Sequence, residues 1–141
     1  MMVTDGDGLP LAAHIASASP AEVTLIETTL AMISVGKAGS SGAPRRKPER
    51  LIADKPYDSN GLRRRLAKRG IEPLIPARST SRMATHQDGR SLRRYRKRWK
   101  IERTFAWLLN FRRLTVRWER LDYTYGAFVY LACAFIVLRR L

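Results

Sequence analysis

Apolar and turn-forming residues alternate along the first third of the chain in a pattern that predicts three elements. Residues 3–12 consist of two short apolar runs on either side of an Asp-Gly-rich turn, which predicts a strand, a tight turn and a second strand. Ser19 and Pro20 are residue types preferred at a helix N-cap and at the first helical position. We therefore expect a helix that begins at Pro20 and runs to about Met32.

The middle of the chain predicts a parallel crossover unit. The apolar run at residues 51–53 predicts a buried strand that ends at Asp54, and residues 71–75 predict another strand. Between them, residues 62–69 have the composition of a helix that ends at Gly70. A strand, a helix and a strand in so short a stretch indicate two parallel strands joined by the helix.

Two further helices are predicted in the last third. A polar loop over residues 76–89 precedes a long helix over residues 91–109, a break near residues 111–114 and a terminal helix over residues 123–140. The longest apolar run, residues 126–138, is shorter than the roughly 20 residues that a membrane-spanning helix needs, so no membrane span is predicted. The terminal helix is therefore expected to lie buried in the core.

Charge is distributed unevenly over these elements. The formal net charge is +15, yet residues 1–36 have a balance of −4, which leaves +19 on the remaining residues. Such positive charge indicates a polyanionic partner, and nucleic acid is favoured over a membrane surface. Residues 36–49 are rich in Gly, Ser, Pro and basic residues and predict an exposed, flexible linker. The only cysteine, Cys133, excludes a disulfide framework and favours a reducing cytoplasm.

One carboxylate, Glu102, lies inside the most basic stretch of the chain, residues 93–103. At 100° per residue along a helix, Glu102 falls on an arc of largely apolar residues, namely Tyr95, Arg98, Phe105, Ala106 and Leu109. A different arc is formed by the cations Arg93, Arg96, Lys100 and Arg103. Glu102 is therefore expected to point toward the core, and the cations outward, where they would bind phosphates in a salt-sensitive way.

A carboxylate that points into a core is costly unless it is paired or binds a metal. Asp5 and Asp54 each follow a predicted strand and face a turn, at the edge where α/β sheets bind ligands. Together with Glu102 they would form an oxygen-rich site suited to Mg²⁺ or Mn²⁺. Two such ions can activate a water or a 3′-hydroxyl and stabilise the leaving oxygen of a phosphodiester.

Each of these acids also has a simpler interpretation. Asp5 could contribute ordinary turn chemistry, and Asp54 could cap a turn. Glu102 could form an inward-facing ion pair with Arg98 at helical spacing, which does not exclude metal binding.

Several polar and aromatic residues are better explained by local structure. Asp58 or Ser59 is predicted to cap the helix that follows. Trp99 and Trp107 could stack on unpaired bases, but packing is the favoured interpretation. The basic arc could be a solvated helix face, but its density and the absence of compensating acids favour a phosphate-binding track.

The motifs around the three acids resemble those of a bacterial insertion-sequence DDE transposase of the IS-five type. The resemblance covers nearly the whole chain and rests on residues 4–11, residues 53–59, the signature Tyr95-x2-Arg98-x3-Glu102, residues 103–108 and residues 111–114. It implies an α/β fold with an RNase H-like mixed sheet flanked by helices, forming one N-terminally truncated domain over residues 1–141. By this resemblance the first and second metal-binding aspartates are Asp5 and Asp54, and the third acid is Glu102.

The resemblance also implies a function. It implies a transposase that uses two Mg²⁺ or Mn²⁺ ions to cleave DNA at the terminal inverted repeats and to join it to target DNA. It implies a homo-oligomer on DNA in the bacterial cytoplasm. The implied DNA-binding residues are Tyr95, Arg98, the four cations of the outer arc, Arg112 and Arg113.

The sequence departs from the family in two places. A lysine is expected seven residues after the glutamate, and this position is Leu109, so Arg112 or Arg113 would have to supply the charge. Few residues precede Asp5, which predicts a truncated copy, or a second reading frame whose upstream partner supplies the N-terminal half. The alternative function is a catalytically inactive transposase remnant or a non-enzymatic basic nucleic-acid-binding protein.

Overall fold

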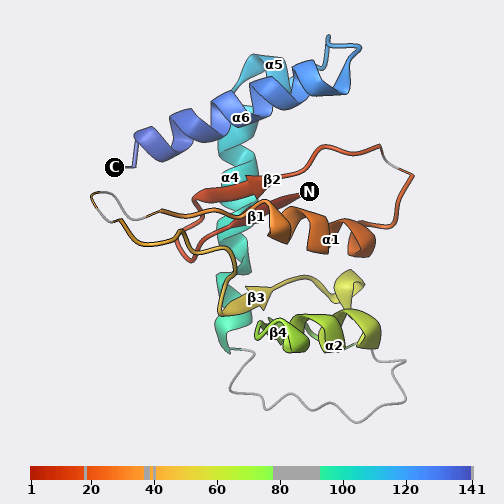
Figure 1. Ribbon diagram of the computed structural model, residues 1–141. Coiled ribbons are helices and arrows are strands. Elements are labelled where there is room, and N and C mark those ends of the chain that lie inside the picture. The colour runs from red at the N-terminus through yellow and green to blue at the C-terminus, as the bar shows by residue number, and fades with distance from the viewer. Residues whose placement is uncertain (18, 37–38, 40, 78–92, 141) are drawn as a thin grey trace. The chain divides into compact units, whose positions relative to one another are not determined.

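The computed structural model describes residues 1–17, 19–36, 39, 41–77 and 93–140 (Figure 1). These residues form two compact units, of which the first comprises residues 1–46 and 99–141 and the second residues 47–98. Their strands form two separate two-stranded sheets, so the fold is mixed α and β. No helix in the described ranges is long and apolar enough to cross a bilayer.

The first unit begins with the predicted hairpin. Strands β1 (Met2–Thr4) and β2 (Pro10–Ala13) are antiparallel, with Val3 opposite Ala12 and an irregularity in the register after Val3. The turn between them contains Gly8 at a φ of +84°, a conformation that favours glycine. The predicted strand, turn and strand over residues 3–12 are therefore confirmed.

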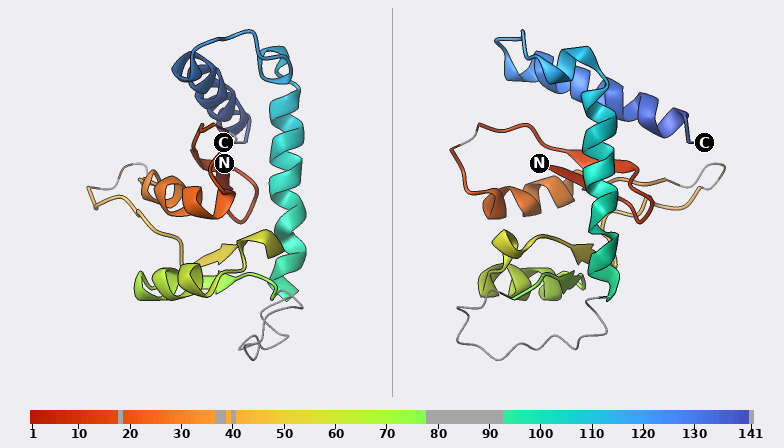
Figure 2. Two further views of the ribbon diagram at one scale, coloured as in Figure 1. Left: turned by 90° about the vertical axis from the view of Figure 1, so that its right-hand side faces the viewer. Right: turned by 180° about the vertical axis from the view of Figure 1, so that it is seen from behind.

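Helices surround this hairpin. The helices are α1 (Glu22–Ala31), α4 (Trp99–Leu109), α5 (Arg112–Thr115) and α6 (Asp122–Leu138). The hairpin packs against α1, α4 and α6, while α5 contacts α4 and α6. The left view of Figure 2 shows the hairpin between α1 and α4. The predicted break after the long helix is confirmed, and it contains the short helix α5.

The start of α1 differs from the prediction. Ala21 rather than Ser19 occupies the N-cap position, and its side chain makes no capping hydrogen bond. The first turn closes on the Ala21 carbonyl oxygen, which accepts hydrogen bonds from the Thr24 amide at 2.9 Å and the Thr24 hydroxyl at 2.7 Å. The predicted N-cap at Ser19 is therefore wrong. The N-cap is Ala21, two residues later, because Thr24 closes the first turn on the Ala21 carbonyl.

Helix α6 is less buried than predicted. Its buried residues are Gly126, Val129, Ala132 and Ile136, which form a single stripe. Tyr123 and Leu138 are 75% and 66% exposed, respectively. The expected burial in the core therefore holds for this stripe and is wrong for the rest of α6, which contacts β2, α4 and α5.

The second unit is the predicted crossover. Strands β3 (Arg50–Ile52) and β4 (Glu72–Leu74) are parallel, with Leu51 opposite Pro73, and helix α2 (Asn60–Lys68) connects them. The apolar side chains of these elements form its core, with Leu51, Leu62, Leu66, Ile71, Leu74 and Ile75 all buried. The strand, helix and strand are therefore confirmed.

The ends of α2 follow the local sequence. Ser59 is the N-cap, and its hydroxyl oxygen accepts a hydrogen bond from the Leu62 amide at 3.5 Å. Asp58 instead forms an ion pair with Arg63 at 2.8 Å. Gly70, at a φ of +70°, follows the end of the helix, as predicted.

The predicted linker and the predicted long helix are only partly described. The described residues of segment 36–49 are mostly exposed, and Val35 and Arg45 exchange two backbone hydrogen bonds at 2.9 Å. Residues 93–95 are helical, η2 (Arg96–Arg98) is a 3₁₀ turn, and α4 begins only at Trp99. The start of the predicted helix at Ser91 and most of the predicted loop lie outside the described residues.

Candidate active site

Asp54 lies in the second unit, after strand β3 and directly before the 3₁₀ turn η1 (Lys55–Tyr57). Its Oδ1 atom accepts a hydrogen bond from an Arg98 guanidinium nitrogen at 2.8 Å and from the Tyr95 hydroxyl at 3.2 Å. Arg98 also donates to the Tyr95 hydroxyl oxygen at 3.1 Å and lies 5.5 Å from the centre of its ring. Tyr95 and Arg98 of the sequence signature therefore contact Asp54 of the second acidic motif.

This cluster remains accessible to solvent. The side chains of Asp54 and Arg98 are 45% and 39% exposed, respectively. The second carboxylate oxygen of Asp54, Oδ2, accepts no hydrogen bond from the described residues. A partly exposed carboxylate is a suitable donor for a hard divalent cation, so the chemistry of Asp54 fits a metal ligand.

Asp5 has the contacts of a turn residue. Its Oδ1 accepts hydrogen bonds from the Asp7 and Leu9 amides, both at 2.8 Å. The backbone closes the same turn, because the Asp5 amide donates to the Leu9 carbonyl at 2.9 Å and the Gly8 amide donates to the Asp5 carbonyl at 3.2 Å. These bonds give Asp5 the role of a turn residue, and its metal-binding role remains a prediction.

Glu102 does not point toward the core. In α4 the buried residues are Thr104 and Leu108, whereas Glu102 is exposed together with Phe105, Ala106 and Leu109. The direction predicted for Glu102 was therefore wrong. The prediction failed for two reasons. Both faces of α4 carry large apolar residues, so the sequence does not reveal which face packs. The 3₁₀ turn before Trp99 also changes the angular positions of the residues that precede α4 relative to those within it.

Two cations of the predicted outer arc are directed toward the hairpin turn instead of outward. Lys100 Nζ donates to the Gly6 carbonyl and lies 3.0 Å from Asp7 Oδ1, while its side chain is only 19% exposed. Arg103 donates to the Asp7 carbonyl at 2.6 Å. The prediction that Lys100 and Arg103 face outward was therefore wrong, because these side chains satisfy backbone carbonyls of the turn.

Four other predicted DNA-binding cations are exposed, namely Arg93, Arg96, Arg112 and Arg113. Arg113 forms an ion pair with Glu119 at 3.1 Å, with an arginine side chain that is 61% exposed. The basic stretch is thus divided into exposed cations and cations that bind the protein's own backbone.

The two tryptophans of α4 pack against arginines. The Arg103 guanidinium lies 4.7 Å from the ring centres of both Trp99 and Trp107, and Arg140 lies 4.2 Å from the Trp107 ring. Packing is therefore confirmed for Trp107, which also packs against the buried cluster of Leu108, Ala132 and Ile136, whereas the Trp99 ring is 50% exposed. Cys133 is partly buried, and burial raises the pKa of its thiol, which makes it less reactive than an exposed thiol.

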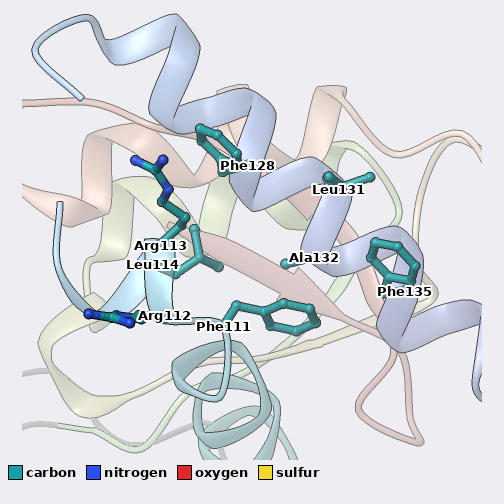
Figure 3. Close-up of a pocket in the computed structure, with 8 residues that line it drawn as sticks. All are labelled: Phe111, Arg112, Arg113, Leu114, Phe128, Leu131, Ala132 and Phe135. Carbon is teal, nitrogen blue, oxygen red and sulfur yellow. The ribbon is translucent and has the colours of Figure 1, made fainter. Parts of the chain in front are cut away.

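A pocket lies between α5 and α6 in the first unit (Figure 3). Its volume of about 180 Å³ is bounded mainly by apolar side chains, among them Phe111, Phe128 and Phe135, with Arg112 and Arg113 also lining it. No carboxylate lines it, so its chemistry does not match the candidate catalytic acids.

The three candidate acids are divided between the two units. No group of three or more His, Cys, Asp or Glu side chains that could hold a metal occurs in the described residues. Asp5 and Glu102 belong to the first unit and Asp54 to the second. The donor types fit Mg²⁺ or Mn²⁺, and the geometry within each unit supports a ligand role most directly for Asp54.

Comparison with known proteins assigns the chain to a family. The model of the family described as "Transposase DDE domain" matches residues 1–137. The chain belongs to the DDE transposase family. It is 42% identical over 135 residues to the putative transposase for insertion sequence element IS402 from Burkholderia cepacia. No solved structure matches the chain.

The match covers the two proteins unequally. The aligned residues make up 96% of this chain and 60% of the Burkholderia cepacia relative. This DDE transposase chain therefore spans about 60% of the length of that relative. The family match confirms the resemblance to bacterial insertion-sequence DDE transposases that the motifs carried.

Proposed function

We propose that this chain performs the chemistry of an insertion-sequence transposase of the IS-five type, on a fold of the RNase H-like kind. The reaction is metal-dependent cleavage of DNA at the element's inverted repeats, followed by joining of 3′-hydroxyls to target DNA. The observation that carries the proposal is the contact of Asp54 with Tyr95 and Arg98, which lie 41 and 44 residues away in the sequence. The contact joins the second acidic motif to the signature that contains Glu102.

In this proposal Asp5, Asp54 and Glu102 are the acids that bind metal. Transposases of the DDE family typically use divalent ions. When bound, such ions would activate the attacking oxygen and stabilise the leaving oxygen of the phosphodiester. Arg98 and Tyr95 hold Asp54 Oδ1 through two hydrogen bonds, which fixes the direction of Oδ2 and balances part of the carboxylate charge.

The exposed cations would bind the DNA backbone. Arg93, Arg96, Arg112 and Arg113 are exposed, and the net charge of +15 favours association with a polyanion. We also propose that the protein acts as a homo-oligomer on DNA in the cytoplasm. An upstream reading frame that supplies the N-terminal half remains a prediction.

A second candidate is a basic nucleic-acid-binding protein without catalysis. It is favoured by the hydrogen bonds of Asp5, which are those of a turn. This candidate predicts salt-dependent DNA binding and no cleavage with Mg²⁺ or Mn²⁺.

The two candidates are separated by a cleavage assay on DNA from the ends of the encoding element. Asp54→Asn should lower the Mg²⁺-dependent cleavage rate by roughly 100-fold or more, the scale expected when a charge-stabilising group leaves an active site. DNA affinity should change by less than about 3-fold, because Asn keeps an oxygen for Arg98.

Asp122→Asn is the matched control, since Asp122 is also a solvent-exposed aspartate that forms an ion pair with an arginine, Arg117. This variant should cleave at the wild-type rate. Equal cleavage by the wild type and Asp54→Asn would eliminate the enzymatic proposal, and absence of cleavage by the wild type under both metals would favour the binding protein.

A further inference from the structure

Three consecutive contacts attach the hairpin turn, residues 5–9, to the first half of α4. Lys100 donates to the Gly6 carbonyl, Arg103 to the Asp7 carbonyl and the Thr104 hydroxyl to the Gly8 carbonyl. The spacing of Lys100, Arg103 and Thr104 places them on one face of the helix. Glu102 lies between them in sequence but on the exposed side of α4.

Thr104 is the buried member of this set. Its exposure is 0%, and its hydroxyl lies 2.9 Å from the Lys100 carbonyl in addition to the contact with Gly8. A buried carbonyl that loses its donor is left desolvated without a hydrogen bond, so the hydroxyl at this position is not equivalent to a methyl group.

Gly8 permits the close approach. A Cβ atom at Gly8 would lie 3.0 Å from the Lys100 carbonyl oxygen and 3.2 Å from Thr104 Oγ1. Any side chain at this position would therefore push the turn away from α4. The φ of +84° adds a second reason why glycine occupies this position.

Arg103 is held from both sides. The Trp99 and Trp107 rings each lie 4.7 Å from its guanidinium, and they occupy positions four residues before and after it on the helix. Its Nε atom is buried and makes no hydrogen bond within the described residues. Stacking therefore keeps the guanidinium in the plane from which it reaches the Asp7 carbonyl.

We propose that Lys100, Arg103 and Thr104 are positioning residues that fix the rotation of α4 about its axis and thereby set the direction of Glu102. The inference rests on the proposed function, because it gives Glu102 a catalytic role. Contacts on one face of a helix determine where its opposite face points. The cations that the sequence suggested as phosphate ligands thus act on the protein's own turn.

Hydrogen exchange and cleavage together test this proposal, with Thr104→Val as the main variant. Valine keeps the shape of threonine but removes the hydroxyl donor. We expect faster amide exchange at Asp7 and Leu9, by about 10-fold for each 1.4 kcal/mol of docking lost. We also expect slower DNA cleavage at unchanged DNA affinity, and Thr104→Ser should restore both properties because it keeps the hydroxyl.

Thr115→Val and Gly39→Ala provide matched controls. The Thr115 hydroxyl donates to the Leu109 carbonyl at 2.7 Å and is remote from the turn, so Thr115→Val should leave exchange at Asp7 and Leu9 unchanged. Gly8→Ala is a second test variant, which needs no change in α4. Gly39→Ala is its control, because Gly39 has a similar φ of +71° but no atom within 4 Å of an added Cβ.

The possible results separate the positioning role from the proposed function. Exchange that does not rise in Thr104→Val or in Gly8→Ala relative to the controls would overturn the docking contacts. Faster exchange with unchanged cleavage would overturn the positioning role. Cleavage at the wild-type rate by Glu102→Gln would reject the proposed catalytic function itself. The hydrogen-exchange rates of Asp7 and Leu9 would still test whether the turn docks on α4, because they do not depend on catalysis.

Discussion

The two units use neighbouring basic residues in different ways. In the second unit Arg98 forms an ion pair with the Asp54 carboxylate at 2.8 Å. In the first unit Lys100 and Arg103, only two and five residues further along the chain, donate to backbone carbonyls of the 5–9 turn. A run of positive charge in the sequence is therefore not one surface in the structure.

The aspartates of the two units differ in the same sense. Asp54 faces a cation and a phenol from a distant segment, and nearly half of its side chain is exposed. Asp5 faces two amides of its own turn. Contacts between distant motifs indicate a functional site more strongly than contacts that merely close a local turn.

The largest expected effect concerns the separate cores of the units. Leu30 in the first unit and Leu66 in the second are both 0% exposed. We expect Leu30→Ala and Leu66→Ala each to lower the free energy of unfolding by about 2–5 kcal/mol in denaturant titrations. Leu121→Ala, at a position that is 53% exposed, should cost less than about 0.5 kcal/mol. Equal costs for Leu66→Ala and Leu121→Ala would contradict the described core.

Two double variants that remove equal charge test whether the basic stretch consists of exposed cations and cations bound to the turn. Arg93→Ala with Arg96→Ala removes exposed cations, so the slope of log K for DNA against log salt should fall by up to about 1.8. Lys100→Ala with Arg103→Ala should change this slope less, because the turn occupies both side chains. The division fails if the second pair lowers the slope as much as the first.

The ion pair of Arg98 should contribute little to stability. Both of its side chains are well exposed, so Arg98→Ala should lower the free energy of unfolding by only about 0.2–1 kcal/mol, less at high salt. Arg117→Ala, which removes the exposed pair with Asp122, should have a similar cost and leave DNA cleavage closer to wild type. Equal cleavage rates for the two variants would count against a role of Arg98 at Asp54.

The smallest effect on stability is expected for Asp5→Asn. Asparagine can accept the same two amide hydrogen bonds, so the free energy of unfolding should change by less than about 0.5 kcal/mol. The proposed function nevertheless predicts that DNA cleavage falls by roughly 100-fold or more, as for Asp54→Asn, because the variant loses a charge that binds metal. Cleavage within a few-fold of wild type would leave Asp5 with the role of a turn residue alone.

Local sequence predicted local structure well. The hairpin, the crossover and the end of α2 at Gly70 all depend on short-range patterns, and all are confirmed. The direction of α4 was mispredicted because Ile101, Trp107 and Leu108 compete with Phe105 and Leu109 as candidates for the packed face. The deciding contact, Thr104 with Gly8, joins residues 96 positions apart and leaves no periodic signal.

The candidate site was only partly accessible to sequence reasoning. The motifs identified Asp54, Tyr95 and Arg98, but not that they contact one another, because the contact spans the crossover unit. The roles of Thr104 and Gly8 were missed, since a threonine in a helix and a glycine in a turn are common.

Cleavage by Glu102→Gln tests the central claim most directly, because Glu102 is the one acid within the basic stretch. The measurement is the Mg²⁺-dependent cleavage rate on element-end DNA at saturating protein, beside the DNA affinity of the same preparation. We predict that the rate falls by roughly 100-fold or more while the affinity stays within about 3-fold of wild type. Cleavage at the wild-type rate would contradict the account.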